Sequence, residues 1–449
     1  MGLIYKFPGG IHPFEGVGGK KTTSALSTIE PPQPSHVVIP LRQNIGAPCS
    51  VLVKEGDDVR VGQRIGEPVG PVSAAVHASV SGVVTACKPC ILANGALEPC
   101  VIIQNDFRDA WIERKPISQP EALSAKELGE AARETGIVGM GGAMFPYGVK
   151  LDIPRDKSID TLILNGSECE PYVTADHRLM LEHSLEIIQG ALLIQRVLNV
   201  RHVIIGIKSS KLDAIETMRK AGQSQAGFTV RCLPDCYPQG SEKQLVYAIT
   251  RRIVKMGDLP LDCGVLVCNV ASVRALWQAV YQGRPLVDRI VTVGGYVQKP
   301  ANYRVRIGTP VEWLIEAAGG FLPDVKMLIF GGPMMGVAIN RQDFPVVKGC
   351  SAITALGKKD VILTAEEPCI RCGRCVDACP VKLEPVTIDR GMRKNWFDGA
   401  GRNDALNCME CGICSWICPS RRSLTQSVKA CKKNISQGHS AAAPTEGGK

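Results

Sequence analysis

The chain has 449 residues, enough for about three domains of ~150 residues each, and 45% of them are hydrophobic, which suffices for ordinary cores. We find no uninterrupted apolar stretch approaching the ~18 residues that a membrane span needs, and MGLIYKFPGGIHPFEG lacks the apolar segment of a signal peptide. The formal charge of +9 accompanies no nucleic-acid-binding motif, so the sequence argues against membrane spans, secretion and nucleic-acid binding.

The chain contains nineteen cysteines, a number that would suggest disulfides in a short secreted protein. Eight of them have the spacing of metal ligands and no export signal accompanies them, so we expect a reducing cytoplasm. Most of the other eleven stand among apolar residues, where thiols act as small hydrophobic groups.

The N-terminal third predicts an arm followed by a β-domain. Residues 1–35 are rich in Gly, Pro and Ser and predict an irregular arm. Residues 36–114 contain short β-branched runs separated by turns such as Gly-Asp-Asp and Ser-Gly. This pattern predicts a small β-barrel or sandwich.

The middle of the chain, residues 120–285, predicts an α/β domain. Apolar strand signals at 161–166, 202–208, 227–233 and 263–270 alternate with helical periodicity at 122–134, 181–198, 210–222 and 241–254. Such alternation is typical of a parallel sheet covered by helices, so we expect a Rossmann-like domain.

Three further segments complete the predicted multidomain α/β plus β architecture. Residues 286–345 predict a small β-grasp-like unit with one helix, and residues 366–433 hold the spaced cysteines in a helical module. The polar segment 434–449 predicts a disordered tail.

The strongest chemical signal is a doubled Cys-x2-Cys-x2-Cys-x3-Cys-Pro motif. In such motifs three closely spaced thiolates bind one [4Fe-4S] cube, while the fourth, before proline, binds the other cube. Zinc sites expect paired Cys-x2-Cys units with longer spacers. Cluster one is therefore expected on Cys369, Cys372, Cys375 and Cys418, and cluster two on Cys408, Cys411, Cys414 and Cys379.

Basic residues gather around these cysteines. If each oxidised cluster with its thiolates carries about −2, the charge of the loaded chain falls from +9 to roughly +5. Two interpretations stay open, local compensation of the cluster charge and a docking face for an acidic partner such as ferredoxin.

A glycine-rich segment, GIVGMGGAMFPYGVKL, lies just before the first α/β strand. Gly139, Gly141 and Gly142 allow backbone N–H groups to approach a phosphate, and Lys150 offers a compensating charge. As a dinucleotide fingerprint it fails, because Met144 replaces the third glycine and the segment follows a helix instead of a strand. From these residues alone, a structural turn is an equally good interpretation.

Several motifs resemble known modules. The pattern EGDDVRVGQRIGE followed by HASVSGVV resembles the lipoyl or biotinyl carrier hammerhead, a barrel-sandwich hybrid, but His77 lies near the position of the modified lysine. The glycine segment and Asn-Gly-Ser-Glu-Cys-Glu-Pro resemble the FMN and NADH motifs of the complex I flavin subunit. With an SLBB-like β-grasp and a ferredoxin-type module following, nearly the whole chain resembles the C subunits of Rnf-type ion-translocating ferredoxin:NAD oxidoreductases.

The resemblance implies the roles of individual residues. Gly139, Gly141, Gly142 and Lys150 would hold the FMN phosphate and ribityl oxygens, and Asn165 and Glu168 would bond the flavin. Nucleotide contacts are implied for Phe145 and Glu170, and a second nucleotide loop contains Gly240, Glu242 and Lys243. The sequence departs from the complex I motif at Met140, Met144, Tyr147 and Ser167. Of these residues, the resemblance implies that Met144 would lie under or against the flavin.

The resemblance also implies a function. The chain would exchange hydride between NAD(H) and FMN without a catalytic side chain and pass single electrons through two clusters. It would be peripheral on the cytoplasmic side of the membrane, with membrane-embedded and ferredoxin-like partner subunits. Alternatives are a soluble flavin and iron-sulfur cobalamin reductase, whose hammerhead would follow the flavin domain, and a flavin-less electron relay.

Overall fold

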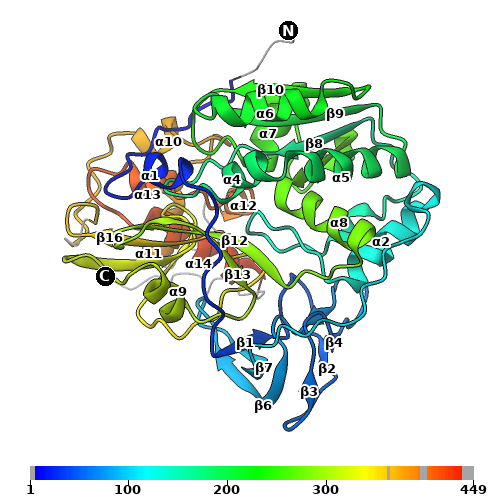
Figure 1. Cartoon of the computed structure of the whole chain (residues 1–449). Coiled ribbons are helices and arrows are strands. Elements are labelled where there is room, and N and C mark those ends of the chain that lie inside the picture. Colours follow the sequence, from blue (N-terminus) through cyan, green and yellow to red (C-terminus); the bar gives the residue numbers. More distant parts are fainter. Residues whose placement is uncertain (1–5, 362–364, 395–401, 437–449) are drawn as a thin grey trace.

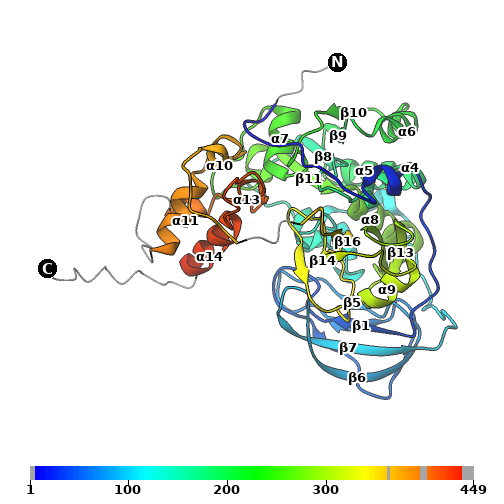
Figure 2. The ribbon, with the colours of Figure 1, turned by 90° about the vertical axis from the view of Figure 1, so that its left-hand side faces the viewer.

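The computed structural model describes residues 6–361, 365–394 and 402–436. Four domains succeed one another along the chain (Figure 1): a β-domain, a helix-covered α/β domain, a second β-rich unit and a helical module. Figure 2 shows the helical module packed beside the α/β domain, at the far end of the molecule from the N-terminal β-domain. In the described part of the chain, none of the helices combines the length and apolarity needed to cross a membrane.

The N-terminal β-domain consists of two small antiparallel sheets, with strand orders β1-β7-β6-β3 and β2-β4-β5. Inward side chains such as Val37, Ile65 and Ile103 form one core, which confirms the expected barrel-sandwich architecture. His77 is only 6% exposed, so this position cannot present a swinging arm to solvent. The strands are β1 (His36–Pro40), β2 (Ser50–Val51), β3 (Asp58–Val59), β4 (Arg64–Glu67), β5 (Val76–His77), β6 (Gly82–Ile91) and β7 (Leu97–Asn105).

The α/β domain has a parallel sheet with strand order β10-β9-β8-β11. Alternate residues of β8 face opposite sides, because Leu162 and Leu164 pack under one helical layer and Ile163 packs under α7. The four predicted strands are confirmed as β8 (Thr161–Asn165), β9 (His202–Lys208), β10 (Phe228–Leu233) and β11 (Val265–Asn269).

The helices of this domain differ from expectation in three places. The periodicity at 181–198 covers the end of one helix and a second, separate helix. The short helix at the end of the glycine segment and the helix after β11 were not predicted. The helices are α2 (Ala125–Glu134), α3 (Tyr147–Leu151), α4 (Ala175–Glu182), α5 (Ser184–Val197), α6 (Leu212–Gly222), α7 (Glu242–Thr250) and α8 (Val270–Gln282), with short 3-10 turns at Pro120–Ala122 and Pro260–Cys263.

The β-grasp-like unit is longer than predicted. Its sheet has the order β13-β12-β16-β14-β15, and β16 lies between β12 and β14 although it follows the predicted end of the unit at residue 345. The elements are β12 (Asp288–Gly295), β13 (Ala301–Arg306), α9 (Val311–Ala317), β14 (Val325–Phe330), β15 (Val337–Ile339) and β16 (Ala352–Gly357).

The helical module repeats one pattern twice. Each cysteine loop ends in a glycine of positive φ, Gly373 or Gly412, which begins a short helix. The helices are α10 (Arg374–Asp377), α11 (Pro385–Arg393), α12 (Arg402–Ala405), α13 (Ile413–Trp416) and α14 (Leu424–Ser436). The predicted tail lies largely outside the described residues, which end at residue 436.

The N-terminal arm connects the other domains. It contains one short helix, α1 (Lys20–Ser24), and runs along the front of the molecule (Figure 1). Gly10 N donates to Ala378 O of the helical module at 3.0 Å, and Ile11 pairs with Tyr237 of the α/β domain. Farther along, Ile29 pairs with Tyr303 on the edge strand β13, so the arm touches three domains.

A buried polar network holds the arm, the α/β domain and the β-grasp together. Asn302 is fully buried, and its Nδ2 donates to the Thr23 carbonyl oxygen at 3.0 Å. Asn302 Oδ1 accepts from the Thr292 hydroxyl at 2.7 Å, and Thr174 Oγ1 lies 2.7 Å from Thr23 Oγ1. Because burial removes water as an alternative partner, each lost bond leaves an unsatisfied polar group.

We therefore expect Asn302→Ala to lower the free energy of unfolding by about 2–3 kcal/mol, because it leaves the Thr23 carbonyl and the threonine hydroxyls unpaired. Chemical denaturation of the two proteins would measure this change in the free energy of unfolding. Asn340 is exposed in the same unit, so Asn340→Ala should change stability by less than about 0.5 kcal/mol. Equal effects of the two substitutions would contradict the role of the network.

Candidate functional site

The glycine segment forms a tight loop at the carboxyl ends of β8 and β11. Gly139 N donates to Phe145 O at 2.8 Å, and Met140 N donates to the Ser272 hydroxyl of α8 at 2.9 Å. Gly142 has φ +110°, and a Cβ placed on it would meet no atom within 4 Å. The loop thus presents open backbone at the edge of a parallel sheet where α/β proteins bind ligands.

A cavity of about 260 Å³ lies beside this loop, and we call it the junction cavity because three domains form its wall. Met335 and Ser351 come from the β-grasp, and Met409 and Cys411 from the helical module. Six of the predicted cofactor residues line it: Gly141, Asn165, Glu168, Glu170, Gly240 and Glu242.

The remaining five predicted cofactor residues do not line this cavity. Lys150 is at the rim, where its Nζ lies 2.7 Å from Glu242 Oε1. Gly139, Gly142 and Phe145 belong to the glycine loop but are not in the wall. Lys243 is turned away, because its Nζ donates to the Lys255 carbonyl oxygen at 2.9 Å.

Asn165 and Gly240 connect the two predicted nucleotide loops. Asn165 ends β8, and its Nδ2 donates to the Gly240 carbonyl oxygen at 2.8 Å. The Gly240 N–H in turn donates to Cys169 Sγ at 3.2 Å. The second loop is therefore fixed against the end of β8.

The Glu168 carboxylate already has partners within the protein. It forms a buried ion pair with Lys211 at 2.6 Å and accepts from the backbone N–H of Asp176 at 2.6 Å. The side chains of Glu168 and Lys211 are 4% and 3% exposed. A carboxylate at the start of α4 also stabilises the positive end of the helix dipole. The predicted flavin bond of Glu168 stays a prediction, and these contacts assign it a positioning role as well.

Glu170 is a buried carboxyl whose hydrogen bonds are incomplete. Its Oε2 accepts from Met334 N at 3.0 Å, whereas Oε1 is buried and has no partner among the described residues. Burial raises the pKa of Glu170 to about 7, partly offset by backbone hydrogen bonds and the charge of Lys20. A polar ligand in the cavity would satisfy Oε1, so this part of the wall fits a nucleotide or flavin.

Two polar residues of the wall were missed from the sequence. Asn269 ends β11, and its Nδ2 donates to Asp176 Oδ2 at 2.7 Å. Burial, followed by the neighbouring Glu168 charge, raises the pKa of Asp176 to about 6. Asn269 carried a usable signal, since it follows a strand and precedes a helix; Asp176 carried none, because the fold alone brings it there.

Met144 lies outside the wall of the junction cavity. An ideal Cβ on Gly349 would lie 2.6 Å from Met144 Cγ, so the Met144 side chain packs against the chain before β16. The expectation that Met144 lies under or against the flavin stays a prediction, which the packing of Met144 against Gly349 does not favour.

The cysteines converge in the predicted crossed sets. Cys369, Cys372, Cys375 and Cys418 line one cavity of about 210 Å³. In the second set, the charges of Cys408, Cys414 and Cys379 all act on Cys411. Within the described ranges no three metal-binding side chains are close enough for a single ion, whereas a cubane spreads its ligands more widely.

The two cluster sites differ in burial. Cys369 and Cys372 are exposed, whereas Cys411 is 8% exposed. Burial and the neighbouring cysteines raise the pKa of Cys411 to about 12, so metal binding must displace a proton there. Backbone N–H groups point at the sulfurs in both loops, from Arg371 to Cys369 at 3.4 Å and from Glu410 to Cys408 at 3.3 Å.

The second set adjoins the junction cavity. Cys411 lines the cavity, and its carbonyl oxygen accepts from the Tyr237 hydroxyl at 2.7 Å. Gln244 of α7 also donates to Pro380 O at 3.3 Å, so the helical module is fixed against the α/β domain. No cysteine of the first set lines the junction cavity, and Cys369 and Cys372 of that set are exposed.

Four family models match the chain in the order of its domains. They are the RnfC barrel sandwich hybrid domain over residues 5–108, the Nuo51 FMN-binding domain over 132–278, the SLBB domain over 290–338 and a 4Fe-4S dicluster domain over 361–419. They confirm the predicted fold classes, FMN and the [4Fe-4S] clusters.

Curated relatives match almost the whole chain. The C subunit of the Na(+)-translocating ferredoxin:NAD(+) oxidoreductase complex of Acetobacterium woodii is 41% identical over 96% of this chain and 97% of its own length. Its counterpart in the proton-translocating ferredoxin:NAD(+) oxidoreductase complex of Clostridium ljungdahlii is 43% identical, over 89% and 87%. The corresponding C subunit of an ion-translocating oxidoreductase complex of Rhodobacter capsulatus is 40% identical, over 97% and 84%.

A solved NAD+-reducing [NiFe]-hydrogenase in the H2-reduced state is 16% identical, with a TM-score of 0.49 over 71% of this chain and 62% of that chain. That likeness is too distant to carry an argument.

The crossed ligation predicts which cysteines share a cluster. Cys379→Ala and Cys411→Ala should each remove the electron paramagnetic resonance signal of the same cluster, and Cys418→Ala the signal of the other. Each should lower iron from about eight to about four atoms per chain.

Cys350→Ala is the matched control, because Cys350 is a buried cysteine outside the motifs and should leave both signals. If Cys379→Ala and Cys418→Ala removed the same signal, the crossed assignment would be wrong.

Proposed function

The chain belongs to the family of C subunits of ion-translocating ferredoxin:NAD oxidoreductase complexes, and we propose that it passes electrons between NAD(H) at the junction cavity and partner subunits through two clusters in a fixed order. The junction cavity comes first, cluster two second and cluster one last. The observation that carries this order is that Cys411 lines the cavity, whereas Cys369 and Cys372 are exposed.

FMN fits the junction cavity through this chain's own residues. Gly141 in the wall, the open backbone of Gly142 next to it and Lys150, which pairs with Glu242 of the wall, suit a phosphate. Asn165, Asn269 and Glu170 offer polar atoms for the rest. FMN, when bound, supplies the conversion between a two-electron hydride and single electrons. The protein's part is to position the reactants, exclude water and hold a cluster close by.

Cluster one is proposed as the exit toward the partner. The exposed Ile370, Arg371 and Arg374 surround its open side, and an acidic redox protein complements such a surface. This favours the docking interpretation of the basic residues. Other basic residues of the module are already paired within it: Arg422 and Arg393 with the buried Asp389, and Lys429 and Lys432 with Glu410.

The cellular setting follows from the family. We place the chain at the cytoplasmic side of the membrane, held by membrane-embedded partner subunits, with ferredoxin reached directly or through a ferredoxin-like subunit. The names of the relatives differ in the ion translocated, which is Na+ in one and the proton in another.

The alternatives have less support. A cobalamin reductase of the kind considered above would have its hammerhead after the flavin domain, whereas here the barrel model matches 5–108 and the FMN model 132–278. A flavin-less relay would not need the open glycine loop or the incompletely bonded Glu170 in one cavity.

Anaerobic purification of the full chain tests the function. We expect about eight irons and one FMN per chain, with bleaching of flavin and cluster absorbance when NADH is added. Eight irons without flavin and without bleaching would leave only a relay that depends on its partners.

Filling the cavity tests its assignment to FMN. Gly141 lines the junction cavity, so Gly141→Leu should lower flavin affinity at least tenfold, about 1.4 kcal/mol, without changing the melting temperature of the flavin-free chain. Equilibrium titration of FMN by fluorescence measures this. Met144→Gly is the matched control in the same loop and should leave affinity unchanged; a gain in affinity would mean that Met144 crowds the flavin.

A further inference from the structure

The proposed function requires a route for protons, and this inference rests on that function. Oxidation of NADH by one-electron acceptors follows NADH → NAD+ + H+ + 2 e−, so one proton leaves for every two electrons. The electrons leave toward the clusters, but the proton must reach solvent. The junction cavity must therefore adjoin groups that move a proton, in either direction of the reaction.

A second, small cavity of about 20 Å³ adjoins the junction cavity, with room for about one water molecule. Asp176 and Met140 line both cavities. Most of the wall of the small cavity is apolar, but Arg274, Gln278 and Arg289 contribute polar groups to it besides the two aspartates. These three residues are 8%, 8% and 3% exposed, so a water there would be enclosed and have several hydrogen-bond partners.

Asp176 stands at the inner end of this path. It begins α4 next to the junction cavity and accepts a hydrogen bond from Asn269. The charged groups facing it are Glu168, which disfavours its ionised form, and Arg289 and Lys211, which favour it. The effects of burial and of the Glu168 charge are larger than those of the two cations, so the pKa of Asp176 is raised to about 6. A carboxyl with this pKa can take up and release a proton near neutral pH.

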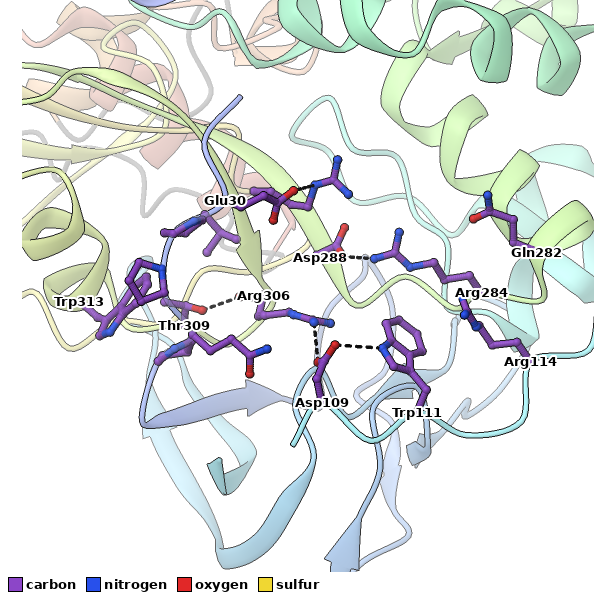
Figure 3. Close-up of a pocket in the computed structure, with 16 residues that line it drawn as sticks. Glu30, Asp109, Trp111, Arg114, Gln282, Arg284, Asp288, Arg306, Thr309 and Trp313 are labelled. Carbon is purple, nitrogen blue, oxygen red and sulfur yellow. Dashed lines mark hydrogen bonds and ion pairs between the residues drawn. The ribbon is translucent and has the colours of Figure 1, made fainter. Parts of the chain in front are cut away.

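Asp288 stands at the outer end. It lines the small cavity and also a larger one of about 330 Å³, which we call the arginine cavity. Figure 3 shows Asp288 directed at Arg284, with which it forms an ion pair. The charge of Asp288 also acts on Arg274 in the wall of the small cavity.

The arginine cavity opens to solvent. The Arg114 side chain on its wall is exposed, and the Glu30 side chain is 66% exposed. Three cavities thus follow one another from the proposed flavin site to the surface, and a carboxylate stands at each of the two boundaries.

We propose that Asp176 and Asp288 carry the proton between the junction cavity and solvent, through a water in the small cavity and out by the arginine cavity. In NADH oxidation Asp176 takes the proton as the two electrons leave, passes it to the enclosed water and Asp288, and the arginine cavity releases it. NAD+ reduction reverses each transfer, so charge and atoms balance.

The test follows electrons and protons separately in the flavin- and cluster-loaded full chain. In anaerobic stopped flow with NADH and ferricyanide as the one-electron acceptor, flavin absorbance reports hydride transfer, and a pH-indicator dye reports proton release. The variants are Asp176→Asn and Asp288→Asn. Asp160→Asn is the control, since Asp160 pairs with Arg252 and lines none of the three cavities.

We expect Asp176→Asn to slow proton release at least about tenfold more than it slows flavin reduction, and small weak acids such as formic acid to restore the rate. Asp288→Asn should show the same split to a smaller extent, and Asp160→Asn none. Proton release that keeps pace with flavin reduction in both variants would overturn the proposal.

A second readout needs no turnover. By infrared spectroscopy the wild-type chain should show carboxylic acid signals with midpoints near pH 6, from Asp176, and near pH 7, from Glu170. Asp176→Asn should lose the signal near pH 6 and keep the other, and Glu170→Gln should do the reverse. If the signal near pH 6 persists in Asp176→Asn, Asp176 is not its source and the route is wrong. Failure of NADH to bleach the wild-type flavin would instead count against the proposed function and leave the infrared result to decide on Asp176.

Discussion

The buried guanidinium of Arg289 is the contact on which the arrangement of the site depends. Arg289 lies on β12 and is 3% exposed. It donates to the carbonyl oxygens of Lys348 and, at 3.4 Å, of Met140, so it ties the β-grasp to the glycine loop. Lys348 continues the link, because its Nζ donates to Ala75 O of the β-domain and Gly136 O after α2 at 2.8 and 2.6 Å. A fixed cation that makes several directed bonds orients domains in a way that apolar contacts do not.

Much of the architecture was predictable, because it depends on patterns of residues that are close together in the sequence. Period-two and helical apolar patterns located the four parallel strands and the main helices, and the spacing of the cysteines identified both cluster sets. Contacts between distant segments were not predictable. The position of β16 in the β-grasp sheet, the orientation of Lys243 and the place of Asp176 all depend on contacts between segments that are separated along the chain, for which sequence periodicity carries no signal.

One local sequence produces two different cluster environments. The loops before α10 and α13 share their cysteine spacing and the positive φ of Gly373 and Gly412. A Cβ on Gly412 would lie 2.5 Å from Met334 O, whereas a Cβ on Gly373 would have its nearest neighbour at 4.0 Å. Close packing of the β-grasp thus buries one loop and leaves its copy exposed. Burial and hydrogen bonding tune cluster potentials, so the repeat can supply two unequal electron carriers from one motif.

The pairing of the arm with the helical module has a consequence for the order in which the chain folds and binds its clusters. Gly10 is synthesised long before its partner Ala378, which lies next to the cluster ligand Cys379. The contacts of the arm with Tyr237 and Tyr303 do not need the helical module, but the bond from Gly10 does. Because metal binding couples to the folding of its ligand loops, this last contact of the arm should form only when the clusters are in place. The segment around Gly10 is therefore expected to be cleaved by proteases more readily in the cluster-free chain.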